Sequence, residues 1–382
     1  MQSQGVREST PPLTRSSDEG TQYDMYLPQS TRGIEIMKTP KARRKSDIHE
    51  LLPEMLSRHE SEAYSFRHLG PGESLVDLFL VEEQMYSFGA KSVLRCTEKG
   101  SQRRCVIKRR MKEGYGCEVE RHWRRVMEKL LRAEPSRHIV AIREILEDDQ
   151  AFYIVMEECN GGPLLDLLLR ESAMPAKELK RIVREMLQAV EFLHDLGLIH
   201  RDIKPENIML STENGESVIK LIDFDTCEEI VSRRLSIAVT PSEKAKRKRS
   251  TRIVGTLGYI APESFNGEYS TASDLFSVGV VFWIIMTGDL PFDDSIYNSN
   301  SSVHGEDDDG DIELVGSPKA RRVLSHLSNT KIDWSISPWP QMPMARDLCQ
   351  KLLAFDPDDR ITSCRVALEH PWLALSSKMG NN

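Results

Sequence analysis

Two short runs hold the residues of this 382-residue chain that could do chemistry. They are His200-Arg201-Asp202-Ile203-Lys204-Pro205-Glu206-Asn207 and Asp223-Phe224-Asp225. A carboxylate such as Asp202 can accept a proton, and the lysine two residues later can neutralise a nearby anion. Asn207 and Asp223 offer the hard oxygen ligands that Mg2+ prefers. The set fits phosphoryl transfer, which depends on positioning and charge neutralisation more than on covalent help from the protein.

These runs resemble the catalytic loop and the metal-binding motif of protein kinases, and Ala261-Pro262-Glu263 resembles the anchor of their C-lobe, in the family's order. The resemblance covers about residues 75–373. It implies an α+β, bilobal protein kinase fold, with a small antiparallel-sheet N-lobe that carries one main helix and a larger, mostly helical C-lobe. It also implies ATP and Mg2+ as cofactors and proteins as substrates.

The resemblance assigns a role to each chemical residue. Asp202 would orient the substrate hydroxyl and accept its proton, and Lys204 would reach the transferred phosphoryl group. Asn207 and Asp223 would hold magnesium. Lys108, in Val106-Ile107-Lys108, would bind the α- and β-phosphates of ATP. An isolated lysine in a strand or aspartate in a turn is usually structural, but these residues stand in the right order beside their own motifs.

Lys108 should pair with an acidic residue of the next helix. Glu118 is the expected partner and Glu120 the alternative, since the spacing permits either. The remaining residues expected to bind the nucleotide lie in the glycine-rich loop and at the end of an apolar strand: Ser87, Gly89, Ser92, Met156, Glu157 and Cys159.

Two departures from the family pattern raise the alternative of a pseudokinase that acts as a scaffold or allosteric partner. Aligned on Gly89, the glycine-rich loop keeps one glycine of three, with Ser87 and Ser92 at the other two places. Small residues still let backbone N–H groups approach phosphate, so we expect ATP binding. Asp225 replaces the glycine that usually follows Asp-Phe. Our hypothesis is that Asp225 stiffens the metal loop while the active arrangement stays feasible.

Hydrophobic patterns predict the elements that must position these residues. Val93–Cys96 and Cys105–Lys108 should be strands of a small antiparallel sheet, joined by a turn at residues 99–101. Glu118–Leu131 has the spacing of an amphipathic helix, and Leu179–Leu193 has the same spacing. Phe152–Met156 should be a buried strand that ends at a polar, glycine-bearing link.

Composition predicts the domain boundaries. Residues 1–72 are rich in Ser, Thr, Pro and charge and should be disordered, except for a short helix at residues 48–56 that could dock or be merely nascent. The kinase domain should span residues 75–373, with the N-lobe at about 75–157, the C-lobe at about 158–373, an irregular insertion at about 298–330 and a short tail at 374–382.

The surrounding sequence resembles the calcium/calmodulin-dependent kinase group, and its helix segment is most similar to kinases activated by MAP kinases. This implies Ser/Thr substrates. Glu206 matches a position that often recognises arginine in the substrate, whereas Pro163 replaces a second acidic contact, so a basophilic preference would be weakened. Arg360 would pair with Glu263, and Asp274 would support the catalytic loop.

Arg201, next to Asp202, implies that a phosphate orders the activation segment. The candidate acceptors are Thr251, Ser250, Ser236 and Thr240, which precedes a proline and so suits a proline-directed or MAP-type upstream kinase. A small repeat, Thr-Pro-Lys-Ala-Arg-Arg from residue 39 and Ser-Pro-Lys-Ala-Arg-Arg from residue 317, is either a second target of such a kinase or a coincidence.

No direct calcium or calmodulin site is evident. The acidic run at residues 306–311 lacks carboxylates at the first and last positions of a calcium loop, and only a short tail follows Trp372. The net charge of −8 conceals opposite local runs, and we expect neither a nucleic-acid nor a membrane partner.

Several features indicate the cytoplasm. The chain has no apolar run of about 20 residues, no signal peptide and seven scattered cysteines, which we expect to be reduced thiols. The basic cluster at residues 244–249 is a nuclear import signal, a basic substrate segment that docks on its own kinase domain, or a solvated loop.

Overall fold

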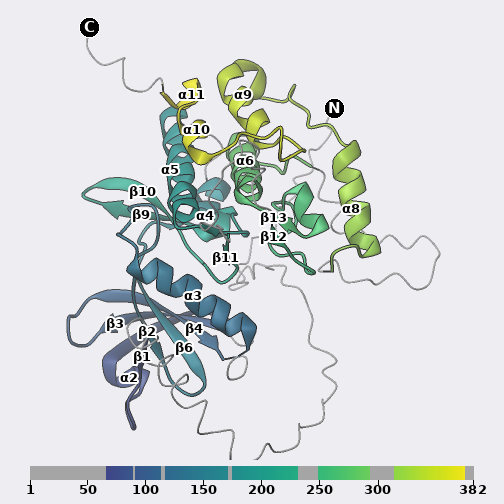
Figure 1. The fold of residues 1–382 in the computed structure, drawn as a ribbon. Helices are drawn as coiled ribbons and strands as arrows, with labels where there is room; N and C mark the ends of the chain where they lie inside the picture. The colour runs from purple at the N-terminus through teal and green to yellow at the C-terminus, as the bar shows by residue number, and fades with distance from the viewer. Residues whose placement is uncertain are drawn as a thin grey trace, which may run out of the picture. The chain divides into compact units, whose positions relative to one another are not determined.

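The computed structural model describes residues 66–88, 91–112, 117–170, 174–230, 248–292 and 314–374. The N-lobe is built on a six-stranded sheet in the order β1-β5-β6-β4-β3-β2 (Figure 1). β1 runs parallel to β5, and the other neighbouring strands pair antiparallel, which matches the predicted antiparallel sheet except at this edge. The N-lobe elements are β1 (Arg67–His68), α2 (Leu75–Leu78), β2 (Phe79–Phe88), β3 (Lys91–Glu98), β4 (Arg104–Met111), α3 (Glu118–Arg132), β5 (Ile142–Glu147) and β6 (Ala151–Glu157).

The N-lobe begins before the predicted boundary. The ring of Phe66 packs edge-on against Trp123 and Phe152, with centroids 6.0 and 6.1 Å apart, and Leu69 is buried. Residues 66–72 were predicted to be disordered, and that prediction is wrong for them. Their polar composition hides two apolar side chains that are stabilised by contacts distant in sequence.

The elements expected around the site are confirmed. β3 and β4 contain the two predicted strands, and β6 contains the predicted buried strand. The amphipathic pattern of α3 buries Trp123, Val126 and Met127 on one face, as period 3.6 requires. The Cys117 side chain accepts a hydrogen bond from the Glu120 N–H and caps this helix.

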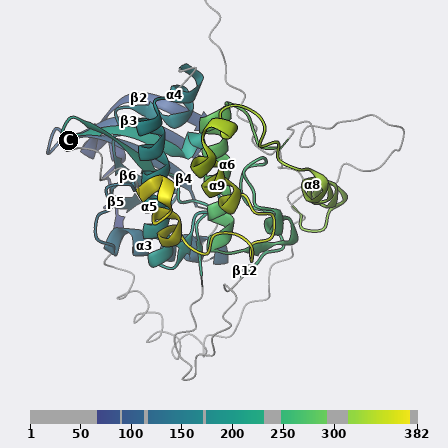
Figure 2. The same ribbon diagram turned by 90° about the horizontal axis from the view of Figure 1, so that it is seen from above.

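The C-lobe is mostly helical, and α5 packs against both α6 and α10 (Figure 2). α6 is mostly apolar and is buried on nearly every side, so it forms the centre of the lobe. The helices are α4 (Leu164–Arg170), α5 (Ala176–Asp195), η1 (Pro205–Asn207), η2 (Pro262–Asn266), α6 (Thr271–Thr287), α8 (Pro318–Asn329), η3 (Trp339–Gln341), α9 (Pro343–Leu352), α10 (Cys364–Leu368) and α11 (Pro371–Ala374).

Short strands frame the catalytic segments of the C-lobe. β9 and β10 form an antiparallel hairpin, to which β7 pairs, and β8 pairs with β11. The strands are β7 (Gly162–Pro163), β8 (Leu198–Ile199), β9 (Ile208–Glu213), β10 (Glu216–Leu221), β11 (Glu228–Glu229), β12 (Lys248–Arg249) and β13 (Glu268–Tyr269).

Part of the predicted irregular insertion is helical. Helix α8 occupies residues 318–329, and the Ser317 hydroxyl caps it by accepting a hydrogen bond from the Ala320 N–H. Ala320, Val323 and Leu327 are buried on one face, a helical pattern that the Ser-rich composition concealed. The second copy of the Pro-Lys-Ala-Arg-Arg repeat therefore begins a helix. The first copy, the 48–56 segment, the acidic run at 306–311 and the basic cluster at 244–247 lie outside the described residues.

Arg360 and Glu263 form the predicted ion pair. The two guanidinium nitrogens of Arg360 lie 2.9 and 3.1 Å from the carboxylate oxygens of Glu263, and both side chains are buried. The Arg360 guanidinium also lies over the ring of Phe276, 5.1 Å from its centroid.

All seven cysteines are within the described parts of the chain, and none forms a disulfide. Burial raises the pKa of the Cys96 thiol to about 11 and that of Cys159 to about 12. Both thiols are therefore protonated at neutral pH. A search of the described helices finds none that is long and apolar enough to cross a membrane.

Candidate active site

Asp274, on α6, fixes the backbone of the catalytic loop. Its two carboxylate oxygens accept hydrogen bonds from the N–H groups of His200 and Arg201, both at 2.9 Å, and one oxygen also lies 2.9 Å from His194 Nε2. Asp274 is fully enclosed, with only 1% of its surface exposed. The predicted support of the loop by Asp274 is confirmed. The left-handed backbone of Arg201, with φ of 69°, is held in place by these bonds.

Asp202 and Lys204 meet at one point of the loop, together with Asn207. Asn207 Nδ2 donates hydrogen bonds to the backbone oxygen of Asp202 at 2.8 Å and to its Oδ2 at 3.0 Å. Lys204 Nζ lies 3.2 Å from the same Oδ2. One oxygen of the carboxylate is therefore held by two side chains, as a positioned base requires.

Thr256 also contacts Asp202 and Lys204, and the sequence did not predict it as a site residue. Its hydroxyl donates to Asp202 Oδ1 at 2.6 Å and accepts from Lys204 Nζ at 2.7 Å. The preceding Gly255 has φ of 119°, and a Cβ there would lie 2.5 Å from the Arg201 carbonyl oxygen. Only glycine permits this close approach. The Gly255-Thr256 dipeptide shortly before the Ala-Pro-Glu anchor was the available signal.

Lys108, on β4, reaches across to the Asp-Phe-Asp motif. Its Nζ lies 2.6 Å from Asp223 Oδ1 and 2.9 Å from Asp225 Oδ2. Burial alone would lower the pKa of Lys108, but the carboxylates of Asp225 and Asp223 outweigh it and raise the pKa. The lysine is therefore charged and available to bind an anion.

Burial and the nearby lysine shift the pKa values of Asp223 and Asp225 in opposite directions. Burial would raise the pKa of Asp223 and of Asp225, yet the neighbouring Lys108 keeps both pKa values below the usual range. Lys91 and Arg110 contribute further to the lowering for Asp225. Asp223 has a left-handed backbone, with φ of 62°, which is uncommon outside glycine and frequent at functional sites.

The residues present fit a magnesium site of the kind that phosphate completes. The Nδ2 of Asn207 is used by Asp202, so its amide oxygen remains as a ligand, and Asp223 is ionised. Among the described residues, no group of three or more His, Cys, Asp or Glu side chains could hold a metal by itself. Mg2+ commonly takes one or two carboxylates and completes its shell with phosphate oxygens and water.

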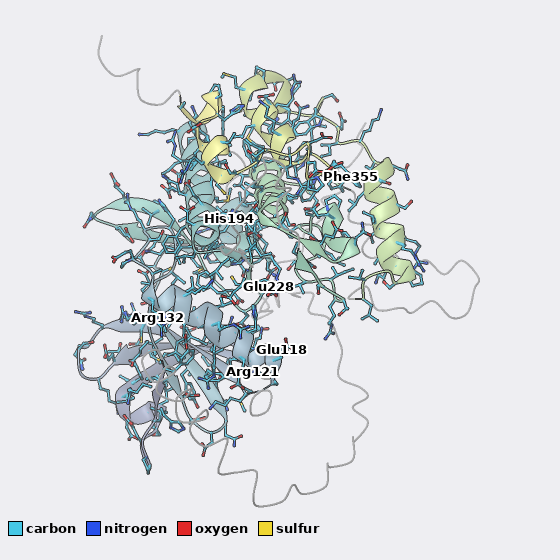
Figure 3. All side chains as sticks on the ribbon, in the orientation of Figure 1. Glu118, Arg121, Arg132, His194, Glu228 and Phe355 are labelled. Carbon is cyan, nitrogen blue, oxygen red and sulfur yellow. The ribbon has the colours of Figure 1, made fainter. Side chains whose placement is uncertain are left out.

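The two predicted helix partners of Lys108 lie elsewhere. Glu118 is exposed at the start of α3, near Arg121 (Figure 3). Glu120 is buried, and its Oε1 lies 3.4 Å from Arg124 Nε. In the described part of the chain, the ion pairs of Lys108 go to Asp223 and Asp225 and to neither glutamate. The structure thus contradicts the expected pairing of Lys108 with Glu118, because residues 223–225 supply its acidic partners.

The glycine-rich loop is described only at its two sides. Ser87 lies next to the end of β2 and pairs across the hairpin with Ser92 on β3, so the two serines lie opposite each other near the base of the loop. Gly89 lies outside the described residues.

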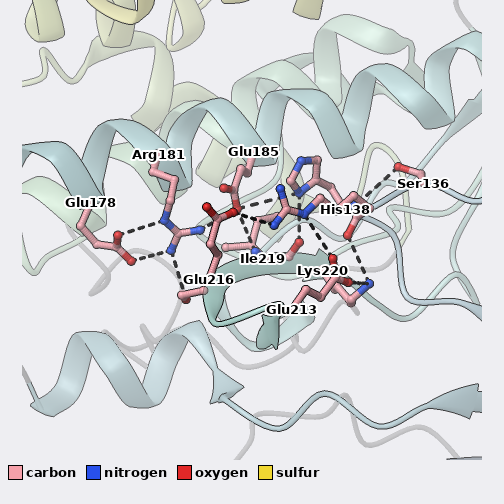
Figure 4. Close-up of polar contacts among 11 residues, drawn as sticks. Ser136, His138, Glu178, Arg181, Glu185, Glu213, Glu216, Ile219 and Lys220 are labelled. Atoms are coloured by element: carbon pink, nitrogen blue, oxygen red, sulfur yellow. Dashed lines mark hydrogen bonds and ion pairs between the residues drawn. The ribbon is translucent and has the colours of Figure 1, made fainter. Parts of the chain in front are cut away.

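Met156, Glu157 and Cys159 stand at the end of β6, where the chain passes into the C-lobe. Lys220 lies 2.9 Å from Glu157 Oε1 and 2.8 Å from Glu213 Oε1, and it is 4% exposed. This lysine belongs to a polar network that joins β10 to α5 (Figure 4). In that network Glu185 accepts hydrogen bonds from Arg181 and from the Ile219 N–H. The network braces the link between the lobes.

Arg201 already forms an ion pair with the carboxylate of Glu228. Its NH1 lies 3.3 Å from Glu228 Oε2, and the other oxygen of Glu228 lies 3.1 Å from His122 Nε2 on α3. Arg201 Nε also donates to the Thr226 carbonyl at 2.6 Å. Glu228 therefore bridges the catalytic loop and α3, which nothing in its local sequence indicated. Of the predicted phosphate acceptors, Ser250 and Thr251 are described, whereas Ser236 and Thr240 are not.

Comparison with known proteins agrees with this geometry. Residues 87–373 match the family model of the protein kinase domain, so the chain belongs to that family. Similar proteins include CDPK-related kinase 4 of Arabidopsis thaliana, 32% identical over 248 residues (64% of this chain and 35% of that protein). Calcium-dependent protein kinase 19 of the same plant is 31% identical over 316 residues (82% and 48%).

The chain spans less than half the length of these relatives. Calcium-dependent protein kinase 3 of Oryza sativa subsp. japonica gives the same picture, with 30% identity over 316 residues and 48% of its own length covered. The bilobal α+β kinase fold is thereby established for the shared domain. The expected similarity to kinases activated by MAP kinases stays a prediction.

Proposed function

We propose that this chain is a protein serine/threonine kinase that transfers the γ-phosphate of ATP to protein hydroxyls. The observation that carries the proposal is the group of Asp202, Lys204, Asn207 and Thr256, in which one carboxylate is oriented by three hydrogen bonds or ion pairs of 2.6–3.2 Å. Asp202 would orient the substrate hydroxyl and accept its proton. Lys204 places a cation beside that base, where the charge of the transferred group accumulates.

Asn207 and Asp223 would hold Mg2+, which neutralises phosphate charge when bound. Lys108 would bind the phosphates, and its charge is secured by the carboxylates at residues 223 and 225. Met156, Glu157 and Cys159 would line the base of the nucleotide, and Ser87 and Ser92 would let the loop backbone approach the phosphates.

We propose basic peptides as the preferred substrates. One carboxylate oxygen of Glu206 is buried without a hydrogen-bond partner, and such an oxygen is costly unless a ligand such as arginine supplies a donor. Pro163 on β7, at the other expected acidic place, pairs with Met209 on β9 and offers no charge. The preference should therefore rest on a single arginine position, close to the phosphoacceptor.

We propose that any activation-segment phosphate, on Thr251 or Ser250, acts in competition with Glu228 for Arg201. A proline-directed or MAP-type kinase remains our proposed upstream enzyme, acting at Thr240, which precedes Pro241. The relatives that are named calcium-dependent suggest a calcium input only for those proteins, and we propose none that is direct here. The proposed location is the cytoplasm, with access to the nucleus.

The test is phosphate transfer from labelled ATP to serine, threonine and tyrosine peptides, with and without Mg2+. We expect transfer to the serine and threonine peptides, abolished by EDTA, and a loss of preference for arginine-containing peptides in Glu206→Gln. Transfer mainly to the tyrosine peptide would contradict the substrate class.

A pseudokinase scaffold is the second candidate. It is favoured by one observation, the engagement of Lys108 by two carboxylates. Nucleotide binding without any phosphate transfer, from protein that carries its activation-segment phosphate, would support this candidate over the first. Transfer that depends on Mg2+ would exclude it.

A further inference from the structure

We propose that Asp225 is the residue that positions Lys108 for nucleotide phosphates, in place of an acidic side chain of α3. We also propose that Asp225 holds the start of β3 through Lys91. The proposal rests on the proposed nucleotide-binding function. It assigns a positioning role to the residue that departs most clearly from the family motif.

Three cations converge on the Asp225 carboxylate. Lys108 Nζ lies 2.9 Å and Lys91 Nζ 3.0 Å from Oδ2, and Arg110 NH1 lies 3.7 Å from Oδ1. The Asp225 side chain is only 8% exposed. Oδ2 makes no well-aligned hydrogen bond, so the attraction is between charges rather than along one directed bond.

The strand register explains why these cations need an anion. Lys91 on β3 stands directly opposite Arg110 on β4, so both side chains project from the same face of the sheet. Lys108 lies two residues before Arg110 and shares that face. Like charges placed opposite each other destabilise a sheet, and burial increases the cost. Asp225 supplies the compensating charge from outside the sheet.

The acidic residues of α3 do not compete for this role. Glu118 is exposed, and the Glu120 carboxylate lies beside Arg124, one turn further along the same helix. Asp223 does contact Lys108, but it is also the expected magnesium ligand. Its charge would be shared with the metal, whereas Asp225 faces the cations of the N-lobe alone. Asp225 is thus the carboxylate that can keep Lys108 in place when metal and nucleotide bind.

The ion pairs of Lys108 attach it to the segment that follows β10 and not to α3. A movement of α3 therefore need not displace the lysine. Lys91 follows the glycine-rich loop directly, and its contact ties that hairpin to the same carboxylate. Loss of Asp225 would therefore leave Lys108 held by Asp223 and remove the contact that ties the hairpin to this segment.

The test is the affinity of the full chain for a fluorescent, non-hydrolysable ATP analogue, measured by titration in Mg2+. We expect Asp225→Asn to weaken binding about tenfold, equal to about 1.4 kcal/mol. Asp225→Glu should restore most of the affinity because it restores the charge. In steady-state assays Asp225→Asn should raise the KM for ATP and leave the KM for the peptide nearly unchanged.

The matched control is Glu82→Gln, which removes a carboxylate paired with Arg104 on the exposed part of the same sheet. It should change nucleotide affinity less than twofold. Glu118→Gln and Glu120→Gln test the competing assignment to α3. A tenfold loss in either of these, with Asp225→Asn unchanged, would overturn the proposal.

Asp225→Asn leaves three buried or half-buried cations together and could fail to fold. Lys91→Met then provides the second variant, because it removes one of those cations while Asp225 remains. Combined with Asp225→Asn, it should restore folding, and the double variant should still bind the analogue about tenfold more weakly than Lys91→Met alone. Equal affinities of these two variants would overturn the positioning role.

Measuring analogue binding and phosphate transfer in the same proteins distinguishes the role of Asp225 from kinase activity. A parent protein that binds the analogue but transfers no phosphate refutes kinase activity and leaves the role of Asp225 measurable. A parent protein that transfers phosphate, with an Asp225→Asn variant of unchanged affinity, refutes the positioning role alone.

Discussion

Replacing Arg360 with leucine should lower the free energy of unfolding by about 3–5 kcal/mol, because it leaves the buried charge of Glu263 without its partner. In the structure Arg360 makes two bonds to Glu263, at 2.9 and 3.1 Å, and three to backbone carbonyls. Those carbonyls belong to Ala272, Ala354 and Phe355, at 2.6, 3.0 and 3.2 Å. A domain whose total stability is about 5–15 kcal/mol would lose a large part of it.

Arg365 offers a matched control five positions later. It forms an ion pair of 3.2 Å with Glu191, but its side chain is 71% exposed. Exposed pairs contribute about 0–1 kcal/mol, so Arg365→Leu should change little. The two variants remove the same type of side chain from the same type of pair. They differ in burial and in the backbone carbonyls that Arg360 also bonds.

The assay is urea unfolding at neutral pH, followed by tryptophan fluorescence. Trp283, Trp334 and Trp339 pack together in the C-lobe, with ring centroids 5.0–5.2 Å apart, so their emission reports on this lobe. We expect the transition of Arg360→Leu to move to clearly lower urea and that of Arg365→Leu to stay near the parent. Equal losses in both variants would refute the argument from burial.

Three further predictions concern the catalytic loop and its support. Glu228→Gln keeps the size of the side chain but removes the charge that joins Arg201 to His122. Because a hydrogen bond to a charged group contributes about 1.5–3 kcal/mol, kcat should fall tenfold or more in initial-rate assays. Gly255→Ala should lower the thermal midpoint and the rate together, because the new Cβ would clash with the Arg201 carbonyl. Burial lowers the pKa of His138, so its contribution to stability is complete above the unfolded pKa of about 6.5 and is lost as the pH falls through the folded pKa. The thermal midpoint of His138→Gln, measured between about pH 7.5 and 5, should therefore fall less steeply than that of the parent.

The Glu228, Gly255 and His138 variants can each contradict the reasoning behind them. An unchanged kcat in Glu228→Gln would mean that the bridge to α3 does not position the loop. A fully stable Gly255→Ala would show that the segment can move away from Arg201. For His138→Gln, a pH dependence equal to that of the parent would assign the acid sensitivity to other groups.

The sequence was sufficient for the parts of the site that local motifs encode. Asp202, Lys204 and Asn207 lie within one short loop, so their spacing alone keeps them within reach of one another. Lys108 and Asp223 were also found, because each stands in a short motif that resembles its counterpart in protein kinases. The strands β3, β4 and β6 and the helices α3 and α5 were predicted from the periodic spacing of their apolar residues.

The contacts that depend on tertiary approach were not predictable. Glu228 meets Arg201 and His122 only because β11 pairs with β8 and brings Glu228 to both residues. Lys91 and Asp225 are far apart in sequence, and neither carries a local signal of the other. The sequence pointed to Glu118 by spacing along α3, but the orientation of that helix and the charge at residue 225 decide the partner of Lys108.

Phosphate transfer by Asp202→Asn, beside the parent protein, tests the central claim most directly. The substitution removes the base but keeps a side chain of the same size between Asn207 and Thr256. We expect the variant to bind the fluorescent ATP analogue with nearly the parent's affinity and to transfer labelled phosphate about 10²–10⁴ times more slowly. Equal transfer by the two proteins, or none by a parent that carries its activation-segment phosphate, would contradict the account.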